Sequence, residues 1–265
     1  MTRDESVWNR FNGSYVLPAD EVHVHQTTLN LPESSFSKLW QSLQPEERQR
    51  ASRFHFEVDK RRCVIGRGLL RLLLGRILGL PADRLRFAYD EFGKPSLIAG
   101  QGLPLQFNLS HSGEVILIAI TVDRAVGVDV EIIRTDFDVD SIAARFFSAN
   151  EYKILASLTG QMRYEAFFAC WTRKEAYLKA RGVGLSLPLD QFDVSFLPTE
   201  EPRLLATRFD PAEASHWTLR ALDLGGDYAA ALAATGSAWK LKCWDCDALL
   251  LMEGAPEVRI RTQLI

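Results

Sequence analysis

The sequence predicts an α+β protein built as a pseudo-dimer, in which two similar α+β subdomains enclose an active site in the cleft between them. Three observations support this. The order strand, helices, strands occurs twice along the 265 residues, without detectable sequence identity between the halves. Apolar residues alternate in the extended segments and recur at helical spacing in the others. No low-complexity linker separates the halves, so we expect a tight interface near residue 125.

The first half, residues 1–125, contains the signals of one strand, several helices and two further strands. Pro45 suits the first turn of a helix, and Gly79 with Pro81 ends the long helix that precedes them. The two histidines of VHVHQTTL are expected to be half-exposed strand residues and not metal ligands. The predicted elements are a strand at 22–29, helices at 35–43, from 45 and over 57–79, a turn at FGKP, and two strands within 106–122 that are joined by a sharp turn at Ser110 to Gly113.

The second half, residues 126–236, repeats this plan. SANEYKIL begins with Ser148 and has Glu151 three residues later, which is the capping-box pattern. MRYEAFFACWTRKEAYLKARG predicts an amphipathic helix ended by Gly182. FDVSF, HWTLRALDL and YAAALAAT predict strands. The tail, residues 237–265, is expected to be a C-terminal extension.

Composition places the chain among ordinary globular proteins, with 47% hydrophobic and 25% charged residues. No run approaches the roughly 18 consecutive apolar residues of a membrane span. MTRDESVWNRF has acids and lacks the apolar core of a signal peptide, so we expect a cytoplasmic protein without a membrane partner. Cys243 and Cys246 form a CWDC pair, which could be redox-active or half of a zinc site, but no second pair stands at metal spacing.

The net charge of −3 hides one basic stretch. From Arg48 to Arg76 there are nine Lys or Arg against two acids. A solvated helix surface, a nucleic-acid patch and a site for one small polyanion are all compatible with it.

VGVDVEI predicts a strand that carries two carboxylates on one face. Successive side chains alternate on a strand, so Asp129 and Glu131 point to the same side. Two like charges raise one another's pKa unless a positive group lies between them. Either this is an edge strand with a solvated outer face, or a cation binds there.

The predicted helix over WTRKEAYLKARG adds a third carboxylate. Trp171, Glu175 and Lys179 are four residues apart and share one stripe, where Glu175 and Lys179 could also be a plain surface ion pair and Trp171 a core residue. Three carboxylates are oxygen donors of the type that binds Mg²⁺ together with phosphate oxygens. SHSG, expected at a turn, would supply a histidine and exposed backbone donors for an anion.

Three motifs in this order carry a resemblance to a known family. FNLSHSG, GVDVE and FFACWTRKEAYLKARGVGL resemble the signatures of the 4′-phosphopantetheinyl transferases of the surfactin-synthetase type. The resemblance covers residues 20–235, including FGKP and the basic stretch. It implies a two-subdomain monomer, in contrast to the short carrier-protein synthases that assemble as trimers.

The resemblance implies a holo-[acyl-carrier-protein] synthase. Such an enzyme transfers the 4′-phosphopantetheine arm of coenzyme A to a serine of an apo acyl or peptidyl carrier protein and releases adenosine 3′,5′-bisphosphate. Mg²⁺, for which Mn²⁺ could substitute, would be held by Asp129, Glu131 and Glu175. Glu175 is the first candidate for the general base, Glu131 the second, and Lys179 would neutralise the leaving phosphate.

The same resemblance implies the contacts to coenzyme A. Ser110 and His111 would contact its phosphates, with His111 counted among the catalytic residues. Lys94 and Pro95 would lie near the adenine. The candidates for the 3′-phosphate are Arg50, Arg53 and Arg62.

Two alternatives belong to other classes. A Mg²⁺-dependent phosphohydrolase of a nucleotide-like substrate would use the same carboxylates but needs no acceptor protein. A non-catalytic nucleic-acid-binding module would use the basic stretch and would not need the acids. The carboxylates of the GVDVE strand argue against the second, so we expect no nucleic-acid partner.

Overall fold

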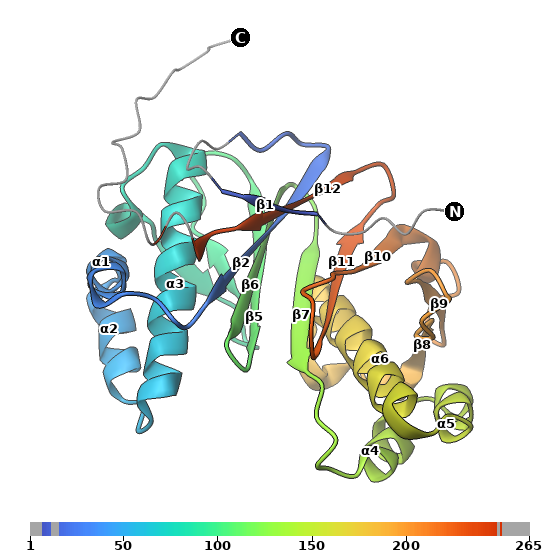
Figure 1. Cartoon of the computed structure of the whole chain (residues 1–265). Coiled ribbons are helices and arrows are strands. Elements are labelled where there is room, and N and C mark those ends of the chain that lie inside the picture. Colours follow the sequence, from blue (N-terminus) through green and yellow to red (C-terminus); the bar gives the residue numbers. More distant parts are fainter. Residues whose placement is uncertain (1–6, 12–15, 248–249, 251–265) are drawn as a thin grey trace.

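The chain folds into two α+β units that lie side by side (Figure 1). The computed structural model describes residues 7–11, 16–247 and 250. Each unit combines a sheet with helices, which confirms the predicted α+β fold with two subdomains. In the described part of the chain, no helix has the length and apolar character needed to cross a membrane.

The first unit is a five-stranded sheet with the order β1-β12-β2-β6-β5. Helices α1 to α3 cover one face, where Leu69 and Leu73 of α3 pack in one cluster with Phe107 and Ile118 of the sheet (Figure 1). A separate β3–β4 ribbon carries FGKP. The elements are β1 (Trp8–Arg10), β2 (Glu21–Thr28), α1 (Glu33–Ser42), α2 (Pro45–Ser52), α3 (Glu57–Leu78), β3 (Phe87–Tyr89), β4 (Pro95–Leu97), β5 (Leu105–Ser112), β6 (Val115–Val122) and β12 (Lys240–Asp245).

The second unit is a three-stranded sheet with the order β10-β11-β7, and α6 packs across it. Helices α4 and α5 and the β8–β9 ribbon surround α6 (Figure 1). The elements are β7 (Val126–Ile132), α4 (Val139–Phe146), α5 (Ala149–Ala156), α6 (Gly160–Arg181), β8 (Phe192–Val194), β9 (Leu204–Thr207), β10 (Trp217–Ala221) and β11 (Tyr228–Thr235).

The two units repeat one helical plan. Helices α3 and α6 have 22 residues each and end at a glycine in the left-handed conformation, Gly79 with φ 65° and Gly182 with φ 70°. The short helices before them, α2 and α5, both begin with a capping box, and Pro45 is the first residue of α2. The predicted cap at Ser148 and the helix ends are therefore confirmed.

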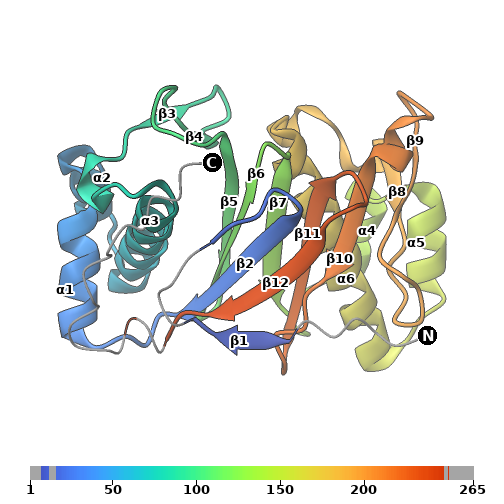
Figure 2. The same ribbon diagram turned by 90° about the horizontal axis from the view of Figure 1, so that it is seen from above.

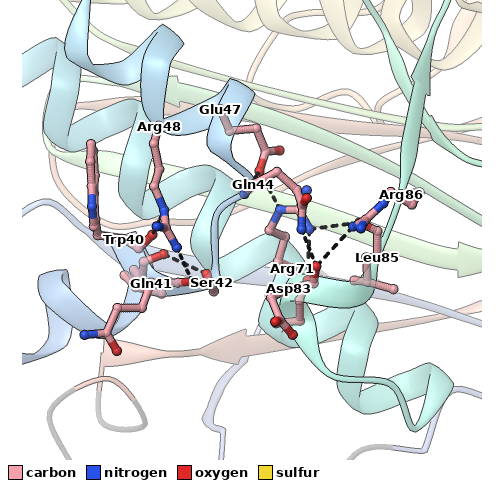
Figure 3. A network of polar contacts seen from close by, with 12 residues as sticks. Trp40, Gln41, Ser42, Gln44, Glu47, Arg48, Arg71, Asp83, Leu85 and Arg86 are labelled. Carbon is pink, nitrogen blue, oxygen red and sulfur yellow. Dashed lines mark hydrogen bonds and ion pairs between the residues drawn. The ribbon is translucent and has the colours of Figure 1, made fainter.

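A buried ion pair joins the short and the long helix of the first unit (Figure 3). Arg71 Nε donates to Glu47 Oε2 at 2.6 Å, and its Nη1 donates to the carbonyls of Ala82 and Leu85 at 2.9 and 3.1 Å. Glu47 is also the third residue of α2, where its side chain accepts from the N-cap backbone as part of the capping box. The pair therefore connects α2, α3 and the loop that follows α3.

The second unit has the same arrangement with lysine in place of arginine. Lys174 Nζ lies 2.8 Å from Oε2 of Glu151, which is the third residue of α5 and completes its capping box. The same Nζ donates to the carbonyls of Leu189 and Phe192. Both charged side chains are buried. The shared plan is therefore carried by equivalent contacts, although the sequences of the halves differ.

The C-terminal tail contributes a strand to the first unit. Strand β12 lies between β1 and β2 and is parallel to both, with Cys243 opposite Val24. With β12 in place, His23 and His25 of β2 are buried, so the expectation that they are half-exposed is wrong. Cys243 and Cys246 pack in different apolar clusters, and Cys246 Sγ lies 3.5 Å from His25 Nδ1.

The two units pack sheet against sheet (Figure 2). Val126, Val128 and Val130 of β7 are fully or almost fully buried in one cluster with residues of β2 and β6, among them Val24 and Leu117. The opposite side of β7 faces α6. Strand β7 is therefore covered on both faces, and a solvated edge strand is excluded.

Candidate active site

Strands β5 and β7 are joined through side chains and not through a backbone ladder. Alternate residues of β5 point toward β7, and their polar atoms bond to its backbone and carboxylates. The bonds are Val128 N to Asn108 Oδ1 at 2.9 Å, Ser110 Oγ to Asp129 Oδ1 at 2.8 Å, Ser112 Oγ to Glu131 Oε2 at 2.7 Å and Ile132 N to Ser112 Oγ at 3.1 Å.

This arrangement corrects the predicted position of the turn. Strand β5 continues through Ser112, and the turn is limited to Gly113 and Glu114. His111 pairs with Ile116 of β6, so the backbone of SHSG is part of a ladder and is not a free set of donors. The strand continues because Ser110 and Ser112 satisfy polar groups of the second unit.

Gly127 allows α6 to lie directly on β7. A Cβ atom at this position would lie 2.1 Å from the carbonyl oxygen of Ala176 and 2.3 Å from the backbone nitrogen of Ala180. Contacts this short to backbone atoms cannot be relieved by a rotamer change. The glycine therefore brings Glu175 and Lys179 of α6 close to the carboxylates of β7.

Lys179 is bound to Asp129. Its Nζ lies 2.5 Å from Asp129 Oδ1 and donates to Ser110 Oγ at 2.9 Å. The surface ion pair with Glu175 that helix spacing left open is not formed. Three elements, β5, β7 and α6, thus meet at one lysine.

The three predicted carboxylates line one cavity of about 370 Å³. Asp129 is 3% exposed, and its second oxygen, Oδ2, has no hydrogen-bond partner among the described residues. Burial raises the pKa of Asp129, Glu131 and Glu175, and the neighbouring Asp129 charge raises that of Glu175 further. The lining residues are Leu109, Ser110, His111, Asp129, Glu131, Trp171, Glu175 and Lys179.

Trp171 and His111 form two parts of this cavity wall. Trp171 stacks on Phe167 with ring centroids 6.0 Å apart, so it is both cavity lining and core. His111 is accessible to solvent but partly covered by its surroundings, and this partial desolvation, followed by the charges of Arg62 and Lys179, lowers its pKa. Arg62 forms an ion pair with Asp59 at 2.9 Å, and its Nη2 donates to the carbonyl of Gly113 at 3.0 Å. Arg62 therefore lies near the site, close to His111.

Lys94 connects the FGKP turn to the end of α6. Its Nζ donates to the carbonyls of Lys179 and Ala180 at 2.5 and 3.2 Å, and burial lowers its pKa. Lys94 and Pro95 line a second cavity of about 320 Å³, which shares Glu175 and Lys179 with the first. The turn therefore lies at the site, but the Lys94 ammonium is used to hold α6.

Arg50 and Arg53 are not brought to either cavity. Both are exposed at the end of α2 and line neither of them. Their role at the 3′-phosphate stays a prediction.

The sequence interpretation did not identify Asn108, Ser112, Gly127 or Arg67 as residues of the site. Asn108 and Ser112 bond to β7, and the signal available for them was the two-residue period of polar side chains in FNLSHS. Arg67 lines the second cavity.

The carboxylates are not a preassembled metal cage. In the parts of the chain that the structure describes, no group of three or more His, Cys, Asp or Glu side chains could hold a metal ion as it stands. The unpartnered Asp129 Oδ2 would nevertheless fit a cation, because a buried oxygen without a partner is costly. A metal here would have to take further ligands from phosphate and water.

Comparison with known proteins identifies the family. The model of the 4′-phosphopantetheinyl transferase superfamily matches residues 125–233, and that of the 4′-phosphopantetheinyl transferase N-terminal region matches residues 30–123. The 4′-phosphopantetheinyl transferase HetI of Nostoc sp. is 39% identical over 231 residues, 86% of this chain and 93% of HetI. The chain belongs to the 4′-phosphopantetheinyl transferase superfamily.

More distant 4′-phosphopantetheinyl transferases are similar over shorter stretches. Sfp of Bacillus subtilis is 36% identical over 153 residues, 57% of this chain and 66% of Sfp. The phosphopantetheinyl transferase of a Thraustochytrium species is 30% identical over 208 residues, 74% of this chain and 72% of that protein. The predicted enzyme class is confirmed: this 4′-phosphopantetheinyl transferase transfers the phosphopantetheine group to carrier proteins. The comparisons give no support to the phosphohydrolase alternative.

Proposed function

We propose that this transferase takes the phosphopantetheine arm from coenzyme A and attaches it to a serine of an apo acyl or peptidyl carrier protein. Asp129 carries this proposal. It is buried between β5 and α6, its Oδ1 accepts from Ser110 and Lys179, and its Oδ2 has no partner in the described chain. A cation and a pyrophosphate beside it would satisfy that oxygen and use the neighbouring lysine.

Mg²⁺ fits the donors of this cavity. Mg²⁺ sites commonly use one or two carboxylates and complete the octahedron with substrate phosphates and water. Asp129, Glu131 and Glu175 would hold the ion, and Mn²⁺ could replace it. When bound, it would neutralise charge on the pyrophosphate. The open arrangement of the three carboxylates agrees with a site that is completed by the substrate.

Glu175 is the proposed general base. The serine oxygen forms a bond to the phosphorus that carries the pantetheine, the bond from this phosphorus to the bridging oxygen breaks, and adenosine 3′,5′-bisphosphate leaves. The serine proton passes to Glu175, directly or through water, or to Glu131 as the second candidate. Burial and the Asp129 charge raise the pKa of Glu175, which makes it a better proton acceptor.

The cations around the cavity are proposed to bind the phosphates of coenzyme A. Lys179, whose side chain is 29% exposed, would neutralise the leaving phosphate. Ser110 and His111 would contact phosphate oxygens from β5, with Arg62 close to His111. Lys94 and Pro95 would border the adenine.

One chain supplies every side of the site, which supports a monomer. Strand β5 comes from the first unit, and β7 and α6 come from the second, so no second copy is needed to complete the cavity. The cytoplasmic location stays a prediction from the sequence.

The test is a transfer assay read by intact mass. The purified protein, coenzyme A and Mg²⁺ should add the mass of phosphopantetheine to an apo carrier protein, and a chelator in excess should stop the addition. A panel of acyl and peptidyl carriers would identify the acceptor class. Transfer that is undiminished in chelator would contradict the role of the metal, and breakdown of coenzyme A without any carrier would indicate a hydrolase.

A further inference from the structure

Strands β5 and β7 run in the same direction, and side chains of β5 take the place of a backbone ladder between them. Ser110 bonds to Asp129 and Ser112 bonds to Glu131, and both pairs are 19 residues apart in the sequence. A constant separation is the register of two parallel strands, in which side chains on one face recur every second residue. The first unit therefore places one serine opposite each carboxylate of β7.

The two serines have different partners. Ser110 Oγ donates to Asp129 Oδ1 at 2.8 Å and accepts from Lys179 Nζ at 2.9 Å. Asp129 also has a charged partner, since Lys179 Nζ lies 2.5 Å from its Oδ1. Within the described chain Glu131 forms no ion pair, and Ser112 is the one side chain that bonds to its carboxylate. The orientation of Glu131 therefore depends on Ser112.

The hydroxyl of Ser112 is itself fixed in direction. A serine hydroxyl has one proton to donate and lone pairs with which to accept. Ile132 N donates to Ser112 Oγ at 3.1 Å, and Ser112 Oγ donates to Glu131 Oε2 at 2.7 Å. The backbone of β7 thus occupies a lone pair of the hydroxyl, and its single proton is left for the carboxylate.

This contact leaves the other oxygen of Glu131 for a ligand. Oε1 forms no hydrogen bond with the described residues, and in contrast to Asp129 Oδ2 it is not a fully buried atom. Glu131 lines the first cavity, of about 370 Å³, together with Asp129 and Glu175. A carboxylate that is bonded through one oxygen presents the other in a restricted direction, and partners of this kind orient metal ligands in proteins.

We propose that Ser112 is a positioning residue, whose hydroxyl orients Glu131 and so strengthens the binding of a divalent cation in the active-site cavity. This rests on the proposed function, because it requires the carboxylates to hold a metal ion. In this role Ser112 acts through Glu131 and does not itself bind the ion or the substrate. Loss of such a partner typically weakens metal binding by about 10–100-fold.

The experiment measures binding of Mn²⁺ to the whole protein with coenzyme A and without a carrier protein, from the electron paramagnetic resonance signal of free Mn²⁺. Ser112→Ala should raise the dissociation constant by about tenfold or more. Ser112→Thr keeps the hydroxyl and should bind Mn²⁺ within about threefold of wild type. In transfer assays Ser112→Ala should need more Mg²⁺ for half its maximal rate, but that maximal rate should stay within about threefold of wild type.

Asn108→Ala is the matched control, because Asn108 Oδ1 accepts from Val128 N across the same two strands but bonds to no carboxylate. It should lower stability and leave the affinity for Mn²⁺ near that of wild type. Glu131→Ala provides a second control, since it removes the group through which Ser112 acts. Adding Ser112→Ala to this variant should weaken Mn²⁺ binding by less than about twofold.

Unchanged affinity for Mn²⁺ in Ser112→Ala would overturn the proposal, as would equal weakening in Asn108→Ala or a full further loss in the Glu131→Ala background. Thermal unfolding of each variant identifies a folding defect. If Ser112→Ala has one, Ser112→Cys, which fills similar space with a weaker hydrogen-bonding group, decides by the same measurement. Failure of wild type to bind Mn²⁺ would instead reject the cation of the proposed function, and the role of Ser112 with it.

Discussion

Lys179 Nζ lies 2.5 Å from Asp129 Oδ1, and this contact joins α6 to β7 at the active-site cavity. Asp129 is buried, while the lysine side chain is 29% exposed. The pair therefore balances a charge that would otherwise be buried alone. In the proposed function, a phosphate of coenzyme A would replace the carboxylate as the partner of this lysine.

Lys179→Met should reduce both transfer and stability. The variant leaves the Asp129 carboxylate buried without its cation, and we expect a loss of about 1–3 kcal/mol in the free energy of unfolding. The double variant with Asp129→Asn should recover part of this loss, because the remaining amide is neutral. Urea unfolding of the single and the double variant measures these stabilities. Equal values for the two variants would show that Lys179 and Asp129 are not coupled.

Glu175→Gln should reduce the rate of transfer by about a hundredfold or more and leave stability nearly unchanged. Glu175 has no hydrogen bond or ion pair to the described residues that the substitution would break, and burial already disfavours its charge. Single-turnover transfer and thermal unfolding are the two measurements. Normal turnover would exclude Glu175 as the base.

Gly127→Ala should displace α6 from β7. The new Cβ would lie 2.1 Å from a backbone carbonyl, so we expect a loss of more than about 2 kcal/mol in unfolding free energy together with loss of transfer. Gly66→Ala in α3 is the matched control, because the nearest atoms to its Cβ would belong to side chains, Leu109 Cδ1 at 3.0 Å and Ile116 Cγ2 at 3.7 Å. Similar costs for both substitutions would contradict the close approach at β7.

Arg71→Met should destabilise the first unit by about 3–5 kcal/mol, since it leaves Glu47 buried without a cation. The variant Arg71→Met/Glu47→Gln should be more stable than the single variant, because no net charge stays buried. Chemical denaturation provides the comparison. A single variant as stable as wild type would show that the network in Figure 3 contributes little.

Stability should decrease as the pH falls below about 6.5, the ordinary pKa of histidine. Burial lowers the pKa of His25 well below that value, and burial likewise lowers that of His23 despite the nearby Glu21. The unfolded state then binds more protons than the folded state, so each of these histidines contributes up to about 1.4 kcal/mol per pH unit. His25→Gln should give a shallower dependence of unfolding free energy on pH between 5 and 7; an unchanged slope would contradict this origin.

Local signals in the sequence predicted the helices and the carboxylates of the site. The glycine after α6 and the capping box of α5 depend on a few neighbouring residues, and the stripe of Glu175 and Lys179 depends on helical spacing alone. The burial of Asp129 and its pairing with Lys179 depend on the approach of α6 to β7, which no local pattern reports. Strand β12 was missed for the same reason, because its partner β2 lies about two hundred residues earlier in the chain.

The position of β12 determines when the first unit can be completed during synthesis. A ribosome delivers β2 long before β12, so the nascent chain must keep the edge of β2 unpaired until the second unit has also been made. An unpaired strand edge is a site at which other chains can add. Synthesis of β12 is therefore the step that allows the first sheet to close, and chains that stop before Lys240 would leave that edge open.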